Sequence, residues 1–184
     1  MKKYLFFSIA LVFICAVGAI ANNISVDAVQ QGMENIDTIA QKIDGTYAIQ
    51  NVQTGKNLRP YNAGVADGNK IVLYNHAEWK CMTWQFIQVD RETYQLKNLY
   101  TSKTFQPSSK LEPGVALWQQ PLKEDNLQYW EFIKQLDKTY LIRLDGTDLY
   151  VTISSDKTNS PIILMPRQNS IGQQWKLVKQ NPRF

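Results

Sequence analysis

Histidine and cysteine are nearly absent from this 184-residue sequence, which holds one histidine, His76, and two cysteines, Cys15 and Cys81. Metal sites built from these residue types need several such ligands, so no metal centre is expected. Nucleotide-binding, zinc-protease and serine-hydrolase motifs are also missing. Cys81 and His76 form the one possible pair of a conventional nucleophile and base, and nothing else in the sequence supports a catalytic role for them. We therefore expect no catalytic residues and no cofactor.

Carboxylates and basic residues give no strong signal either. Glu124, Asp125 and Glu131 stand among lysines and are interpreted as solvated surface, with the carboxylate pair of a glycoside hydrolase as the alternative. The formal net charge is +4, from 20 Lys and Arg against 16 Asp and Glu, and no run of about five basic residues occurs. Nucleic acid is accordingly not an expected partner.

The N-terminus has the three parts of a secretory signal peptide. Lys2 and Lys3 precede an apolar run over residues 4–17, and Ala19-Ile20-Ala21 provides a small-residue exit. The run is shorter than the roughly 20 residues that a spanning helix needs. We predict a signal peptide over 1–21, no membrane span in the mature chain, and a secreted or periplasmic location. A lipoprotein signal ending at Cys15 is the alternative, disfavoured by Ile14.

The loss of Cys15 with the signal leaves Cys81 alone, which excludes a framework of disulfides. Cys81 is interpreted as a buried apolar side chain, with a thiol that pairs between chains as the alternative.

Residues 22–44 carry an apolar residue at every third or fourth position, which predicts an amphipathic helix or linker. Ser25 is a suitable N-cap, Gly45 stands just past the end, and the apolar stripe comprises Val26, Val29, Met33, Ile36, Ala40 and Ile43. This helix either lays its stripe on the rest of the chain or binds another exported protein.

The remainder of the chain is an internal repeat. Three segments open on a tyrosine and close on a tryptophan, with tyrosines at 47, 94 and 140 and tryptophans at 84, 130 and 175. We place the repeats at 45–91, 92–137 and 138–180. Such near-constant spacing indicates three copies of one structural unit.

Each repeat predicts four short strands and no helix. A turn rich in Asn, Asp, Gly and Thr separates the first two strands, an apolar run such as Ile71-Val72-Leu73-Tyr74 forms the third, and the tryptophan begins the fourth. One such unit cannot bury its apolar face alone, whereas three units around an axis can. The sequence therefore predicts a closed all-β body.

Two of the repeats end in Gln128-Tyr129-Trp130 and Gln173-Gln174-Trp175, and the first ends in Met82-Thr83-Trp84. These Q-x-W strings, at this period and in three copies, resemble the ricin B-type β-trefoil lectin family over residues 45–180. The resemblance implies a β-trefoil with pseudo-threefold symmetry. It also implies that the tryptophans pack near the axis and that the Gln side chains hold loops, so that both are scaffold.

The resemblance places a sugar site elsewhere in each repeat: an Asp after the apolar residue of strand two, an aromatic platform at the end of strand three, and an Asn before the Q-x-W Gln. No repeat keeps the Asp, a departure from the family's usual binding of galactose. The second repeat matches the family's sugar site best. Its candidate residues are Trp118 as the platform, with Gln106, Asn126 and Gln119.

The first repeat is the next candidate, with Tyr74 as platform beside Asn75, Trp79 and Arg59, which suits an acidic sugar. In the third repeat Tyr150, Met165 and Gly172 take the three positions, and we interpret this repeat as structural.

The favoured function is a secreted, non-catalytic, lectin-like carbohydrate-binding protein whose partner is a glycan or polysaccharide. The alternative is a protein-interaction or structural trefoil in which the sugar sites have degenerated and another exported protein is bound. A toxin-accessory subunit is a third, weaker hypothesis.

Overall fold

The computed structural model describes residues 42–182. The predicted signal peptide and residues 22–41 of the predicted helix lie outside the described residues. Residues 42–44, the end of that prediction, have no regular secondary structure, and Ile43 is buried, with its backbone N–H donating to the Tyr94 hydroxyl at 2.9 Å. No helix within 42–182 is long and apolar enough to cross a membrane.

Twelve strands occupy the described part of the chain, and each predicted repeat contains four of them. The first repeat holds β1 (Thr46–Asn51), β2 (Asn57–Pro60), β3 (Ile71–Tyr74) and β4 (Trp84–Asp90). The second holds β5 (Thr93–Asn98), β6 (Thr104–Pro107), β7 (Leu117–Gln120) and β8 (Tyr129–Lys134). The third holds β9 (Tyr140–Leu144), β10 (Leu149–Ile153), β11 (Ile162–Pro166) and β12 (Trp175–Lys179).

Four short 3-10 helices connect some of these strands. η1 (Tyr61–Ala63) follows β2, while η2 (Lys80–Met82), η3 (Asn126–Gln128) and η4 (Ile171–Gln173) stand just before the last strand of each repeat. The three-residue turns repeat at equivalent places because the repeats share one chain path.

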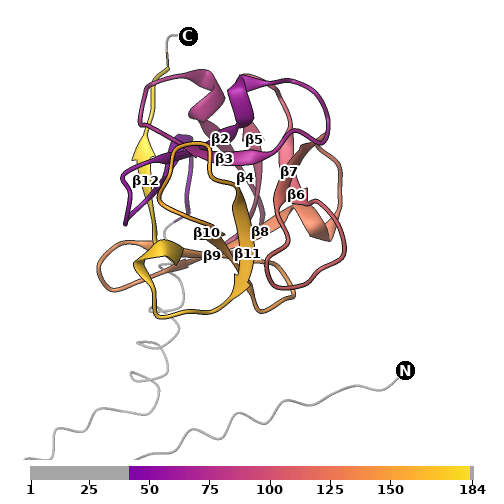
Figure 1. Ribbon diagram of the computed structural model, residues 1–184. Coiled ribbons are helices and arrows are strands. Elements are labelled where there is room, and N and C mark those ends of the chain that lie inside the picture. Colours follow the sequence, from indigo (N-terminus) through magenta and orange to yellow (C-terminus); the bar gives the residue numbers. More distant parts are fainter. Residues whose placement is uncertain (1–41, 183–184) are drawn as a thin grey trace, which may run out of the picture. The chain divides into compact units, whose positions relative to one another are not determined.

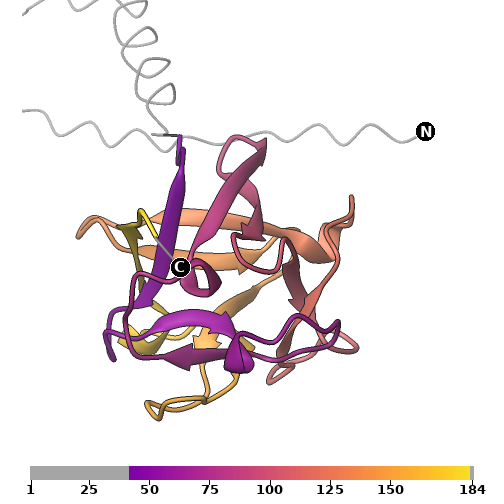
Figure 2. The ribbon, with the colours of Figure 1, turned by 90° about the horizontal axis from the view of Figure 1, so that it is seen from above.

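Six strands close into an antiparallel barrel in the order β1, β4, β5, β8, β9, β12 and back to β1. The first and last strands lie side by side, indigo and yellow in Figure 2, with Tyr47 opposite Lys179 and Asn51 opposite Trp175. This pairing leaves the barrel without a free edge, which is how an all-β body of short strands hides its backbone groups.

The other six strands form three hairpins, β2–β3, β6–β7 and β10–β11, which meet one another around the axis (Figure 1). Three isolated bridges join them in a ring: Lys70 with Trp118, Ala116 with Ile163, and Pro161 with Val72. A six-stranded barrel joined to three such hairpins is a β-trefoil, so the predicted fold class is confirmed.

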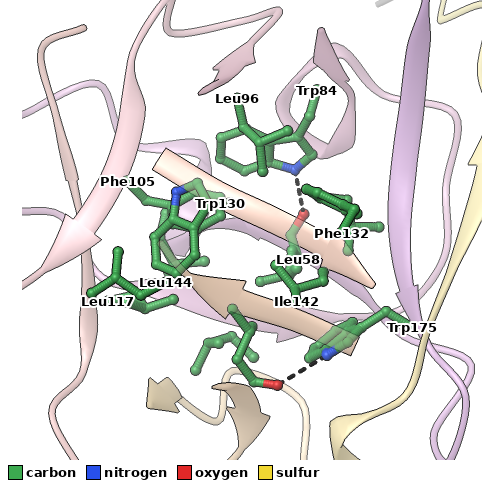
Figure 3. Close-up of a cluster of buried hydrophobic side chains, with 14 of the residues drawn as sticks. Leu58, Trp84, Leu96, Phe105, Leu117, Trp130, Phe132, Ile142, Leu144 and Trp175 are labelled. Carbon is green, nitrogen blue, oxygen red and sulfur yellow. Dashed lines mark hydrogen bonds between the residues drawn. The ribbon is translucent and has the colours of Figure 1, made fainter. Parts of the chain in front are cut away.

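The core is built on the three repeated tryptophans (Figure 3). Trp84, Trp130 and Trp175 are fully buried, and Phe105 lies between two of them, with its ring centroid 5.1 Å from that of Trp84 and 4.9 Å from that of Trp130. Burial of about 200 Å² per ring at about 25 cal/mol per Å² corresponds to about 5 kcal/mol of transfer free energy for each tryptophan. The tryptophans are scaffold, as predicted.

The Q-x-W glutamines hold the loops that precede them. Gln128 donates to the Pro121 carbonyl at 2.9 Å and accepts from the Lys123 backbone N–H at 3.0 Å. Gln173 makes the same pair of contacts with Pro166 and Gln168, at 2.9 and 2.7 Å. Both amides are fully buried, so the predicted structural role is confirmed.

Candidate functional site

Strand register shows which residue of each repeat stands at the platform position. Tyr74 pairs with Asn57 at one end of β3, while Ile71 pairs with Pro60 at the other. In the second hairpin the matching pairs are Gln120 with Thr104 and Leu117 with Pro107. Gln120 also precedes its Q-x-W Gln by eight residues, as Tyr74 precedes Met82 and Met165 precedes Gln173.

The alignment of Trp118 with Tyr74 is therefore wrong by two residues. Trp118 corresponds instead to Val72 and Ile163, the residues bridged around the axis. Its half-buried side chain packs over Gly68, where an added Cβ would lie 3.7 Å from the indole. The second repeat thus has an amide, Gln120, where the family's sugar platform would stand.

A buried polar residue explains the error. Gln119 occupies the core position that Leu73 and Leu164 fill in the other repeats, and it is fully buried. Its Nε2 donates to the Gly64 and Ala66 carbonyls at 3.1 and 2.9 Å, which fixes the long loop of the first repeat against β7. A polar residue in this core position hides the strand from any search for apolar runs.

The structure does not gather the four second-repeat candidates around one opening. The Gln106 side chain accepts from the Gln128 amide at 2.9 Å, and Asn126 lies exposed in η3. The Gln119 amide donates to the Ala66 carbonyl of the first-repeat loop, and Trp118 forms the bridge to Lys70 that joins two hairpins. Gln106 is correctly placed as the residue after the apolar side chain of strand two, but its amide serves the scaffold.

In the third repeat, the residue predicted at the Asp position of strand two is also wrong by two residues. Trp175 Nε1 donates to the Val151 carbonyl at 3.0 Å, as Trp84 Nε1 does to Leu58 at 3.3 Å (Figure 3). Thr152, not Tyr150, therefore stands at the position of Arg59, and its hydroxyl accepts from the Gln173 amide. The expectation that this repeat is structural fits these contacts.

The first repeat brings its predicted residues together. Arg59 on β2 is 6% exposed, and its guanidinium carbon lies 3.4 Å from the centre of the Tyr74 ring. The Tyr74 and Trp79 ring centroids are 6.3 Å apart, at 34° between ring planes. Because the cation already covers one face of Tyr74, the more accessible aromatic surface belongs to Trp79, which is 41% exposed.

A small pocket opens beside these rings. It has a volume of about 180 Å³ and is lined by Ala63, Trp79, Cys81 and Tyr100. Tyr100, 54% exposed, comes from the turn of the second repeat, which is held against the first by a bond from the Leu99 N–H to the Thr83 carbonyl at 3.0 Å. Repeat-internal motifs gave no signal for Tyr100, because the contact crosses from one repeat to the next.

Asn75 and His76 lie next to this group but are otherwise engaged. Asn75 is exposed and its side-chain oxygen accepts from the Thr158 hydroxyl at 3.4 Å, while the Asn57 amide lies 3.0 Å from His76 Nδ1. Burial raises the pKa of the Cys81 thiol, and the Arg59 guanidinium offsets this only in part. A buried thiol of raised pKa is a poor nucleophile, and this agrees with Cys81 as a buried apolar side chain.

Two of the three carboxylates considered for a catalytic pair, Glu131 and Asp125, are matched to a cation. Glu131 accepts from Arg143 Nε at 2.7 Å, and this contact raises the pKa of Arg143. Asp125 pairs with Lys123 at 2.8 Å.

A larger cavity, of about 550 Å³, lies between the first and third repeats. Tyr61, Lys70 and Asn159 are among its lining residues, together with Gly68, Asn69, Val72 and Pro161. It contains none of the residues predicted from the sequence.

Solved structures of low sequence identity share this fold. The designed three-fold symmetric protein ThreeFoil is 20% identical, with a TM-score of 0.70 over 73% of this chain and 99% of its own. The Rhizoctonia solani agglutinin is 17% identical, with a TM-score of 0.68 over 76% of this chain and 98% of its own. The Macrolepiota procera ricin B-like lectin, solved with lactose, is 15% identical, with a TM-score of 0.63 over 76% and 99%.

Comparison by sequence gives a match at the level of the family. A search of curated proteins found no match. The family model described as ricin-type β-trefoil lectin domain-like matches residues 35–120, which span the first repeat and most of the second. Repeats, fold and family model agree, and the resemblance of this chain to the ricin B-type β-trefoil lectins is confirmed.

Proposed function

We propose that this chain is an exported carbohydrate-binding protein that recognises a glycan through its first repeat and catalyses no reaction. The observation that supports the proposal is the pair of exposed rings, Trp79 and Tyr100, which line a pocket next to the first-repeat residues to which the resemblance gives the sugar site. The export rests on the sequence of residues 1–21.

The chemistry of the pocket suits one sugar ring. Aromatic faces stack on the C–H face of a sugar, and large rings exposed in a concave place are unusual unless they bind something. The volume of about 180 Å³ is below the range of roughly 300–1,000 Å³ for drug-sized ligands. We therefore expect a terminal or single residue of a glycan to enter, with weak affinity at one site and useful avidity on a multivalent surface.

A glycan array, followed by titration with the best ligand, tests the proposal. We expect Trp79→Ala to weaken binding by about tenfold or more, as expected for loss of about 1.4 kcal/mol of stacking. Tyr61→Ala serves as the matched control, because Tyr61 is a similarly exposed ring in the other cavity.

Folded protein that binds no glycan would contradict the proposal and favour the protein-interaction or structural trefoil. Binding that is lost in Tyr61→Ala and kept in Trp79→Ala would move the site to the larger cavity.

A further inference from the structure

Arg59 stands where the family resemblance places a carboxylate, and the sign of the charge is therefore reversed at this position. The side chain is 94% buried, since 6% remains exposed. Its Nε has no hydrogen-bond partner, and none of the ion pairs within residues 42–182 includes it. A buried cation with no carboxylate partner is unfavourable unless something compensates the charge.

The charge adjoins two residues that connect it to the first-repeat pocket. The guanidinium stacks on Tyr74, whose ring adjoins Trp79, and its charge lowers the pKa of the Cys81 thiol against the larger opposing effect of burial. Trp79 and Cys81 are both walls of the pocket. Arg59 is thus close to the pocket on two sides: Tyr74 adjoins the wall residue Trp79, and Cys81 is itself part of the wall.

No neighbour in the pocket neutralises the charge. Burial raises the pKa of the Cys81 thiol, so the thiol stays protonated at neutral pH and supplies no negative charge. Tyr74 offers its ring face, which attracts a cation without cancelling it. Arg59 is therefore a buried positive charge without an ion-pair partner in the described part of the chain, one aromatic residue removed from the pocket wall, and burial strengthens its effect on a nearby anion.

We propose that the first-repeat pocket prefers a sugar that carries an anionic group, a carboxylate or a sulfate ester, with Arg59 as the compensating cation. This inference rests on the proposed function, because it names the class of glycan taken by the same site. A guanidinium matches both anions, since each presents oxygens to its planar set of N–H donors. Trp79 stacks on the sugar ring while Arg59 selects its charge.

Paired ligands test the inference on the wild-type protein. One pair is an oligogalacturonide and its carboxyl-reduced, neutral counterpart, and the other is a sulfated galactan oligosaccharide and its desulfated form. We expect at least one acidic member to bind about tenfold or more tightly than its neutral counterpart, as a charge-assisted contact predicts. The pair that shows the preference identifies the anion as carboxylate or sulfate.

Equal binding of acidic and neutral members would overturn the preference for anions and leave the carbohydrate-binding function standing. Binding of neither pair, with no ligand on a wider glycan array, would overturn the proposed function and this inference together.

Variants separate charge from stacking. Arg59→Met should lose the preference for the acidic member while binding of the neutral member is kept, and Arg59→Lys should keep part of the preference. Arg91→Met is the matched control, because Arg91 is exposed in the turn between β4 and β5 and its removal changes the net charge equally. A preference that survives in Arg59→Met would contradict the assignment. If Arg59→Met does not fold, the wild-type ligand pairs decide.

Discussion

The three repeated tryptophans occupy equivalent places, yet their indole N–H groups differ. Trp84 and Trp175 each donate to a backbone carbonyl of strand two, whereas Trp130 Nε1 is buried without a partner. A buried donor without an acceptor loses its hydrogen bond to water and gains nothing in return. The pseudo-symmetry of the core is therefore incomplete at the second repeat.

Trp130→Phe should consequently destabilise the fold less than Trp175→Phe. Both changes remove similar apolar area, but only the second breaks a hydrogen bond and leaves the Val151 carbonyl without its donor. We expect the two free energies of unfolding to differ by about 1–2 kcal/mol, measured by urea denaturation. Equal losses would show that the Trp130 N–H has a partner in solution.

Ser102 is a second residue that departs from its equivalent. It has φ of 57°, in the left-handed region, where Gly55 stands in the first repeat with φ of 65°. A serine pays a steric penalty there that glycine avoids. Ser102→Gly should raise the free energy of unfolding by about 0.5–1 kcal/mol.

The reverse change, Gly55→Ser, provides the control for Ser102→Gly and should lower stability by a similar amount. Thermal unfolding of both variants measures the two changes in stability. A loss of stability in Ser102→Gly would contradict backbone strain at Ser102.

Residue spacing predicted the buried tryptophans and the strand register of the first repeat, but it aligned Trp118 wrongly with Tyr74. The apolar run Val115-Ala116-Leu117-Trp118 copies the pattern of Ile71-Val72-Leu73-Tyr74, while the true equivalent contains Gln119 in a core position. Hydrophobic pattern alone assigns such a glutamine to the surface. The constant eight-residue distance to the Q-x-W position was the signal that could have corrected the register.

At the scale of elements, one joint connects each repeat to the next. In each repeat, the residue directly after the first strand donates its backbone N–H to the carbonyl of the residue before the tryptophan of an adjoining repeat. The three bonds run from Val52 to Gln174, from Leu99 to Thr83 and from Asp145 to Tyr129, all at 2.9–3.0 Å. Two of the joints have an added amide. Asn51 donates to the Gly172 carbonyl at 3.1 Å, and Asn98 to that of Cys81 at 3.0 Å.

The Asn51 amide joins the first repeat to the third and should matter to the whole barrel. Asn51→Leu copies Leu144, which stands at this place in the third repeat, but it leaves the Gly172 carbonyl and the Thr54 N–H without their side-chain partners. We expect the free energy of unfolding to fall by about 1–3 kcal/mol. Chemical denaturation measures it, and an unchanged midpoint would show that the joint depends on backbone bonds alone.

The strands themselves were predictable because each repeat shows turn residues, an apolar run and a tryptophan in a fixed order. The pairing of strands between repeats was not visible in the same way. It depends on ring closure, which brings Tyr100 from the second repeat to the pocket of the first. A site that crosses a repeat boundary carries no motif within either repeat.

At the scale of the whole molecule, closure by β1 and β12 makes the three repeats interdependent, although the repeats differ in their residues. The first keeps an aromatic residue at the platform position, Tyr74, while Gln120 and Met165 replace it in the others. At the position of Arg59, the other two repeats have Gln106 and Thr152, whose oxygens accept from the buried Gln128 and Gln173 amides and so are engaged in the scaffold. The proposed ligand binding is accordingly placed in the first repeat.

The most direct test of this assignment is an NMR titration that follows the five indole N–H resonances of the protein. On addition of a glycan that binds, the Trp79 resonance should shift or broaden, because its ring lies at the pocket and is 41% exposed. The resonances of Trp118 and of the buried Trp84, Trp130 and Trp175 should stay in place. Movement of Trp118 with Trp79 unaffected would contradict the account and return the binding site to the second repeat.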